Sequence, residues 1–548
     1  MWQAGRPPYF AAPLCFACVA SSRCARAAPT PLFSVDNPQG IGHGNIVCVC
    51  VRFRGMGFLS NMAVRSKIIK GSIVLSTGQA VSQGCGFIRN IILARILSKD
   101  DFGLAATFAI TISMFEMVNR LGVSGLIVQS KNGEDPHFQA TAHSFQLLAG
   151  LASAFLIFIF AGWVSVFFNA TEALWAFQIL AVIPIMQGLG HLDVNRMVRS
   201  MRYLPVVLVD TVPQALITIA ALPLALWLRD YRVILWLLMA RWVMNAGGTH
   251  VYAERGFRFG WDKRHIPGIL DFSWPLLING FLMFGVLQGD RFLVGHFYTK
   301  ADLAAYSVAV QLTLIPGMMF VSVVSAIMLP LLSAVQSNPV EFRRKYRTCV
   351  QALSAFSAVF AIVLIVAGEG IVTTVFGQKY AGTGVILGWL VTANAFRIIR
   401  AAPAIAATAK GDTKNHMISN IFRLSGLALG VAAVLCKQSL PTLAACGLAG
   451  EALATIVSST RLSKVHRLPL GDTYLPIGVA FLFVALSGAL ALLGAPQWHW
   501  AMVSLLTVGL SAASVGVTIL LFQQLRSEMS SLALPYLVRM GLAAAKES

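Results

Sequence analysis

Apolar runs long enough to cross a lipid bilayer recur along this chain, and they limit what it can fold into. The stretch from Trp274 to Pro330 holds two such runs, separated by a short polar turn at residues 298–302. A helix needs about 20 predominantly apolar residues to span the hydrocarbon core. Only 12% of the 548 residues are charged, whereas soluble domains carry about 25%. The sequence therefore predicts an all-α polytopic membrane protein.

We expect about fourteen spanning helices. They lie near residues 71–93, 103–129, 139–163, 172–190, 204–228, 232–252, 270–295, 303–334, 348–367, 382–404, 415–436, 440–461, 474–494 and 499–523. The net charge of +20 is spread over alternate loops and not gathered in one patch, so we expect no nucleic-acid partner. One set of loops holds about seventeen Lys and Arg and the opposite set about seven, a bias that marks the cytoplasmic side. Both termini are therefore predicted to be cytoplasmic.

A short motif recurs after roughly 200 residues. Ser98-Lys99-x-Asp101-Phe102 matches Thr299-Lys300-x-Asp302-Leu303, and Arg89 falls within one position of Arg291 in the same comparison. Pro136 and Pro339 also correspond, each just before an apolar run. Internal repeats that carry several helices are typical of transporters, with the substrate path between the two halves.

Residues 1–60 differ from the rest of the chain. They are rich in Pro, Ala, Cys and Arg and contain no run of spanning length. We expect either an over-extended start, with the natural chain beginning near Met56 or Met62, or a disordered tail. Five of the nine cysteines lie here, but Cys15-x-x-Cys18 lacks a well-spaced second pair, so no metal site is expected.

The sequence offers no sign of enzymatic chemistry. It contains no G-x-x-x-x-G-K-[ST], no H-E-x-x-H and no D-x-D pair, so nucleotide- and metal-dependent motifs are missing. The outer loops are short, which argues against membrane glycosyltransferases, ligases and polymerases. We therefore predict no catalytic residues and no cofactor.

Charged residues inside apolar helices are the candidate functional groups, because such residues are costly in a bilayer and usually face a bundle interior or a wet cavity. Some have simpler explanations. Asp290 and Arg291 could lie at the membrane edge, Glu116 and Arg120 could neutralise each other, and Arg241 could extend to the membrane surface. Asp193 and Glu369 lie near helix ends.

Arg397 and Arg400 are harder to explain in this way. They are three residues apart and share one helix face, and nothing acidic stands beside them in the sequence. Two like charges on one face favour a bound anion, and the planar guanidinium binds phosphate with two hydrogen bonds. We predict that Arg89, Arg291, Arg397, Arg400 and Arg423 bind substrate. Glu116, Asp290 and Glu451 are candidate ion-coupling carboxylates.

The layout of about residues 65–525 resembles the oligosaccharide flippases of polysaccharide and lipopolysaccharide assembly, the Wzx-type branch of the multidrug/oligosaccharidyl-lipid/polysaccharide exporter superfamily. The segments ARILSKDDFG (residues 94–103) and QGDRFLVGHFYTKADLAAYSVA (residues 288–309) carry the resemblance. It implies two parallel six-helix lobes around a central cavity, followed by two extra helices. A basic cavity of this kind is expected to hold the diphosphate and sugars of an undecaprenyl-linked oligosaccharide. Residues 1–60 have no counterpart in the family.

The expected organisation is therefore an extension at 1–60, an N-lobe at 61–258, a C-lobe at 259–465, and two helices with a cytoplasmic tail at 466–548. The expected function is flipping of a lipid-linked oligosaccharide across the bacterial inner membrane by alternating access, for surface polysaccharide assembly. Membrane lipids are expected partners, and a polysaccharide polymerase and export machinery are further candidates. The alternatives are a multidrug/cation antiporter of the same superfamily, a lipid II flippase, and, from another class, a membrane polymerase or glycosyltransferase.

Overall fold

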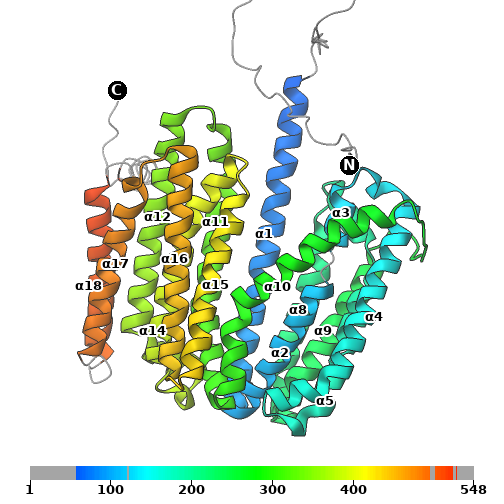
Figure 1. The fold of residues 1–548 in the computed structure, drawn as a ribbon, viewed down its shortest axis with the longest axis horizontal. Coiled ribbons are helices and arrows are strands. Elements are labelled where there is room, and N and C mark those ends of the chain that lie inside the picture. The colour runs from blue at the N-terminus through cyan, green and yellow to red at the C-terminus, as the bar shows by residue number, and fades with distance from the viewer. Residues whose placement is uncertain (1–56, 120–121, 494–499, 523–525, 527–548) are drawn as a thin grey trace, which may run out of the picture. The chain divides into compact units, whose positions relative to one another are not determined.

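The computed structural model describes residues 57–119, 122–493, 500–522 and 526. The chain divides into two compact units, Met1–Ser60 and Asn61–Ser548, and the second unit holds nearly all of the described residues. The prediction for residues 1–60 lies outside the described residues except at its end, because helix α1 begins at Gly57. The described residues are helical throughout and contain no strand, as Figure 1 shows.

The first half of the chain contains nine α-helices and two 3-10 turns in its described residues. They are α1 (Gly57–Ile96), α2 (Lys99–Asn119), α3 (Val123–Gln129), η1 (Lys131–Glu134), α4 (Pro136–Phe167), η2 (Thr171–Ala173), α5 (Leu174–Ile179), α6 (Val182–Gly188), α7 (Asp193–Arg199), α8 (Leu204–Leu228) and α9 (Arg232–Val251). We call these elements the N-terminal half.

The second half repeats the pattern and adds two helices. The C-terminal half comprises α10 (Ile266–Phe297), α11 (Lys300–Ala334), α12 (Pro339–Val366), α13 (Gly368–Phe376), η3 (Gln378–Tyr380), α14 (Gly384–Ala409), α15 (Lys414–Leu435) and α16 (Leu440–His466). The extra helices α17 (Gly471–Leu492) and α18 (Trp500–Leu521) pack beside α12 (Figure 1).

Helices occupy all fourteen places where the sequence predicts a span. Ten of them are long and apolar enough to cross a membrane, or eleven if a bent pair of helices counts as one span. The outward faces of such helices carry large apolar side chains, such as Trp227 (79% exposed) and Leu505 (75% exposed). Because a bilayer solvates these groups and water does not, the chain is a multi-pass membrane protein. The count of fourteen remains a prediction.

Two of the predicted spans are broken, and local chemistry explains both breaks. The span at 103–129 is divided between α2 and α3, and Gly122 before α3 has a φ of 67°, which glycine adopts easily. The span at 172–190 is divided between α5 and α6. Pro184 in α6 has no N–H to bond the carbonyl group of Leu180, so a continuous helix loses a hydrogen bond there.

The repeated motif marks the starts of equivalent helices. Ser98 Oγ accepts a hydrogen bond from the backbone N–H of Asp101 (3.0 Å), and Thr299 Oγ1 accepts one from Asp302 (3.1 Å). These side chains cap α2 and α11 by satisfying a free N–H group of the first turn. The corresponding prolines are the first residues of α4 and α12. The sequence repeat therefore reflects repeated helix starts.

The two halves contact each other at the ends of helices near the repeated motif. α2 packs on α10 and α11, and Gly103 lies so close to α11 that a β-carbon there would be 1.9 Å from the carbonyl oxygen of Lys300. The side chain of Arg95 donates to the carbonyl groups of Thr374 and of Val375 (2.9 Å), at the end of α13. We call this region, together with Lys379, the cross-half contact.

Candidate functional site

The predicted arginines of the C-terminal half come together inside that half. Arg397 and Arg400 project from α14, and Arg423 projects from α15. All three converge on one carboxylate, that of Glu451 on α16, which is only 2% exposed. We call Arg397, Arg400 and Arg423 the arginine cluster.

The contacts within the cluster are close. Arg397 Nε donates a hydrogen bond to Glu451 Oε1 (2.7 Å), and Arg397 Nη2 lies 2.6 Å from the same oxygen. Arg423 Nε lies 2.5 Å from Oε1, and Arg400 Nη2 lies 3.6 Å from Oε2. Opposite charges attract strongly where water is excluded, so the three guanidinium groups hold this carboxylate in place. The predicted ion-coupling role of Glu451 stays a prediction.

Two glycines explain how Arg423 reaches Glu451. Gly450 precedes Glu451 directly, and Gly426 lies one turn after Arg423. A β-carbon on Gly450 would lie 2.6 Å from the carbonyl oxygen of Arg423, and one on Gly426 would lie 3.0 Å from that of Cys446. Small residues allow helix backbones in membranes to approach closely. Because α15 and α16 cross so closely at these glycines, the neighbouring side chains of Arg423 and Glu451 come into contact.

A cavity of about 80 Å³ lies against the cluster. Arg397, Arg423 and Glu451 form part of its wall, and Asp290 and Tyr306 form another part. Asp290 on α10 accepts hydrogen bonds from the Tyr306 hydroxyl (2.9 Å) and from the backbone N–H of Arg291 (2.8 Å). The remaining lining is mostly apolar, with Gly285, Leu287, Leu390, Leu427 and Leu443 among its members.

A groove lies between α10 and α15. Its volume is about 320 Å³, and its polar lining residues are Asn279, Thr413, Lys414, His416 and Asn420. Asn420 Oδ1 accepts a hydrogen bond from Arg400 Nη1 (3.4 Å). Arg400 therefore links this groove to the buried carboxylate.

The N-terminal half also holds an ion pair between two successive helices, and in this pair the acidic residue comes first in the sequence. Asp210 on α8 bonds Arg241 on α9 (3.2 Å) and accepts from the Ser82 hydroxyl on α1 (2.8 Å). In the corresponding pair of the C-terminal half the basic residue comes first, with Arg423 on α15 and Glu451 on α16. Arg241 therefore pairs with a carboxylate of the same half, a partner that the sequence alone did not indicate.

The other predicted groups lie outside the arginine cluster. Arg89 on α1 is partly buried, and its Nη1 has no hydrogen-bond partner among the described residues. Arg291 Nη1 donates to Gln288 (3.3 Å). Glu116 accepts from Gln187 Nε2 (2.8 Å), and Arg120 lies outside the described residues. The predicted substrate-binding and ion-coupling roles of these groups stay predictions.

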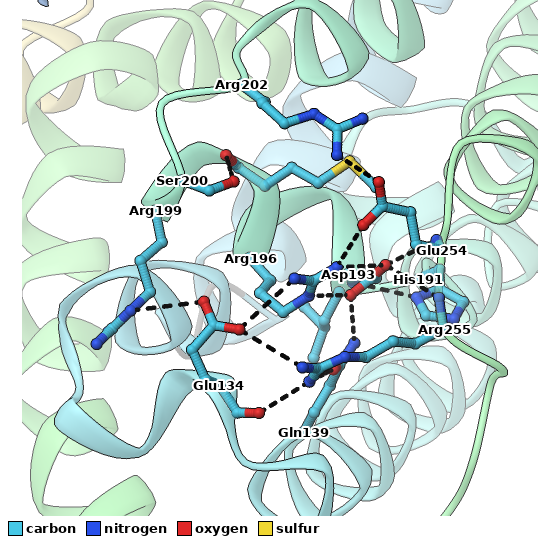
Figure 2. A network of polar contacts seen from close by, with 12 residues as sticks. Glu134, Gln139, His191, Asp193, Arg196, Arg199, Ser200, Arg202, Glu254 and Arg255 are labelled. Atoms are coloured by element: carbon cyan, nitrogen blue, oxygen red, sulfur yellow. Dashed lines mark hydrogen bonds and ion pairs between the residues drawn. The ribbon is translucent and has the colours of Figure 1, made fainter.

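A separate polar network joins the loops at one end of the N-terminal half (Figure 2). Asp193, fully buried at the start of α7, bonds Arg196 Nε (2.5 Å) and the backbone N–H of Glu254 (2.8 Å). Arg196 also bonds Glu254 (2.8 Å) and lies 3.5 Å from Glu134. Burial alone would raise the pKa of Asp193, but the Arg196 side chain and the backbone donors lower it to about 2. The network thus fixes the predicted cytoplasmic loops.

Comparison with known families identifies the chain. Residues 92–384, more than half of its length, match the family model described as polysaccharide biosynthesis protein. The chain belongs to the polysaccharide biosynthesis protein family. The match runs from the end of α1 to the start of α14, so it includes the cross-half contact and Asp290.

Curated relatives of this family member are distant in sequence. The succinoglycan biosynthesis transport protein ExoT of Rhizobium meliloti (strain 1021) is 22% identical over 326 residues, 58% of this chain and 64% of that protein. The alignment therefore spans less than two thirds of that relative. The teichuronic acid biosynthesis protein TuaB of Bacillus subtilis (strain 168) is 20% identical over 406 residues, 73% of this chain and 83% of that protein.

Two solved structures share the fold. The lipid II flippase MurJ, in an inward closed conformation, aligns with a TM-score of 0.64 at 15% identity, over 81% of this chain and 98% of MurJ. An inward-facing multidrug resistance transporter of the MATE family aligns with a TM-score of 0.61 at 12% identity, over 73% of this chain and 99% of that structure. This family member therefore has the many-span transporter fold that its sequence resemblance implied.

Sequence reasoning named the arginines and Glu451 but missed how they are arranged. Glu451 follows Arg397 by 54 residues, so no local spacing links them. Tyr306 and Asn394, which also line the cavity, were not singled out because a tyrosine and an asparagine in apolar helices carry no distinctive pattern. The paired glycines on α15 and α16 were the available signal for a close helix contact.

Proposed function

We propose that this family member moves an undecaprenyl-diphosphate-linked oligosaccharide from the cytoplasmic to the outer leaflet of the bacterial inner membrane. The product would serve surface polysaccharide assembly. The observation that carries the proposal is the arginine cluster, in which three largely buried guanidinium groups share one carboxylate. A surplus of positive charge within a membrane protein favours an anionic substrate.

The relatives support this assignment by their names. One is a succinoglycan transport protein, another acts in teichuronic acid biosynthesis, and a structural neighbour flips lipid II. Two of these names concern the biosynthesis of succinoglycan or teichuronic acid, and the third concerns the flipping of a lipid. A carrier that reorients such a lipid breaks no covalent bond, so we propose that the chain acts without catalytic residues.

Alternating access supplies the proposed mechanism. The cross-half contact joins α1, α2, α11 and α13 at the side predicted to face outward. We propose that Arg89 and Arg291, at corresponding places in the two halves, attract the diphosphate from the cytoplasmic side together with the arginine cluster. Rocking of the two halves then opens the cross-half contact and releases the headgroup outward.

The multidrug/cation antiporter is the competing proposal, and Glu451 speaks against it. A carboxylate already bound by three arginines leaves little negative charge for a cation. Glu116, Asp290 and Asp210 remain as acidic groups for the antiporter, and each already has a hydrogen-bond donor or a basic partner.

Reconstitution tests the proposal. Purified protein in vesicles should make a fluorescent undecaprenyl-diphosphate oligosaccharide accessible to an external quencher, while a lipid with an uncharged headgroup moves no faster than in empty vesicles. The mass of the lipid should stay unchanged. Efflux of a cationic dye without lipid movement would favour the antiporter, and a new glycosidic bond would identify an enzyme.

A further inference from the structure

The arginine cluster holds more positive charge than its immediate partner can balance. Three guanidinium groups face the single carboxylate of Glu451. Asp290, on another part of the same cavity wall, supplies one further negative charge, which leaves one positive charge over. A buried charge that lacks a partner is unfavourable, so the cluster as it stands is incomplete.

Free donors in the cluster point to the same conclusion. Arg423 Nη2 and Arg400 Nε are buried and have no hydrogen-bond partner among the described residues. Buried donors in native structures are almost always satisfied by protein, water or ligand. Two of the three guanidinium groups therefore have a donor available for a further anion.

The space beside the cluster suits a phosphate group. The cavity of about 80 Å³ touches Arg397, Arg423 and Glu451, and it equals the volume of two to three waters at about 30 Å³ each. The larger groove of about 320 Å³ lies on the other side, where Asn420 receives a hydrogen bond from Arg400. A diphosphate approaching through this groove would reach Arg400 first.

We propose that Glu451 is a built-in counter-anion, which occupies the arginine cluster while the transport path is empty and is displaced when the substrate's diphosphate binds. This inference rests on the proposed function. Carboxylate and phosphate present the same kind of acceptor to a guanidinium fork, so the two compete for the same donors. The competition lowers the affinity for the diphosphate and so permits its release on the far side.

Glu451 also solves the problem of the empty carrier. Without Glu451, the three arginines of an unloaded protein would be left with Asp290 as their nearest carboxylate during the return step. With Glu451 in place, the same donors are held in position for the next substrate. Glu451 thus acts as a positioning residue, because it orients the groups that bind substrate.

Thermal unfolding of the detergent-purified chain tests the competition, with sodium pyrophosphate as the probe and sodium chloride at matched ionic strength as the reference. Pyrophosphate should stabilise the wild type weakly. Its apparent Kd should fall at least tenfold in Glu451→Gln, which removes the competing charge. Glu451→Asp moves the carboxylate away from the arginines by one methylene group and should give an intermediate Kd. This variant replaces Glu451→Gln in the test if Glu451→Gln fails to fold. Arg423→Gln added to Glu451→Gln should reverse the gain.

Asp210→Asn is the matched control, because it removes a carboxylate from the ion pair of the other half. Its Kd for pyrophosphate should equal that of the wild type. An unchanged Kd in Glu451→Gln and Glu451→Asp would overturn the proposal, since a purely structural role predicts lower stability without tighter binding. Equal stabilisation by chloride would also overturn it, because the site would then not select a diphosphate.

Vesicle transport separates this inference from the proposed function. In Glu451→Gln, tighter binding with slower release should lower both KM and kcat for the lipid-linked oligosaccharide. If wild-type vesicles move no such lipid while pyrophosphate still binds more tightly to Glu451→Gln, the function is wrong and the competition at the cluster stands.

Discussion

Arg95 and Lys379 each bind the carbonyl groups at the end of a helix in the other half of the molecule. Arg95, in the last turn of α1, donates to Thr374 and Val375 at the end of α13. Lys379, just after α13, donates to the carbonyl groups of Leu97 and of Arg95 itself (3.1 Å). The last carbonyl groups of a helix lack partners within it, and cations are favoured there. Each half therefore caps a helix of the other.

This reciprocal capping predicts that Arg95→Ala and Lys379→Ala loosen the cross-half contact, which the loop charges predict to face outward. A hydrogen bond from a charged group contributes about 1.5–3 kcal/mol when buried and less when exposed, so we expect each change to raise the open population about three- to tenfold. Labelling of a cysteine introduced at Asn90, which bonds Gln311 across the halves (2.7 Å), measures that opening from the outside.

A matched control is Arg229→Ala, because among the described residues the Arg229 side chain bonds only the carbonyl group of Leu226, in its own helix (3.2 Å). It should label at the wild-type rate. The double variant should show less than the product of the two single effects, since both bonds close the same contact. Wild-type labelling in both single variants would mean that the capping does not hold the halves together.

A larger residue at Gly103 should also loosen the cross-half contact, in this case by steric overlap. A methyl group there would overlap the carbonyl oxygen of Lys300, at 1.9 Å from the added β-carbon. Gly103→Ala should therefore disfavour the closed outer contact, increase external labelling and impair transport, while the protein inserts at normal levels. Gly84→Ala in α1 is the control, because nothing lies within 4 Å of its β-carbon. Unimpaired transport in Gly103→Ala would show that the closed arrangement is not required.

The Asp193 network predicts a defined pH dependence. The pKa of Asp193 falls from 3.8 to about 2 on folding. A lowered pKa contributes stability above the unfolded value, and that stability is lost as the pH falls from about 4 toward 2. The protection of backbone amides in residues 252–258 against hydrogen exchange, relative to their intrinsic exchange rate at each pH, should fall over this range. Asp193→Asn should show low protection already at pH 7 and little further loss on acidification. A loss of protection in acid equal to that of the wild type would contradict the assignment.

The charge bias of the loops predicts the topology. Reporter fusions after Lys99, Lys300 and Lys437 should face outward, and fusions after Arg202, Arg347 and Arg467 should face the cytoplasm. The cross-half contact involves the first two of these turns, so an inward reporter after Lys99 or Lys300 would reverse the proposed direction of opening. One inverted loop would also change the number of spans.

The positions of the helices could be predicted because membrane helices depend on local apolar length. The repeat that contains Ser98 and Thr299 was visible in the sequence, but the capping role of these two residues was recognised only in the structure. The breaks at Gly122 and Pro184 have local causes, but the apolar runs continue across them and hide them. What could not be predicted is pairing over distance, such as Glu451 with Arg397 on another helix. Such contacts depend on how helices cross, and helix crossings leave only indirect signs such as Gly426 and Gly450.

The crossing of α15 and α16 has a practical consequence for experiments on motion. Gly426 and Gly450 face each other so closely that a β-carbon on Gly450 would lie 2.8 Å from the Cα of Gly426. Sliding one helix along the other would bring larger side chains into that narrow place, so we expect the two helices to move as one body. Spin labels on the lipid-facing sides of α15 and α16 should therefore keep a constant separation in every state of the transport cycle. That separation provides a fixed internal length against which pulsed-resonance distances between the two halves can be calibrated.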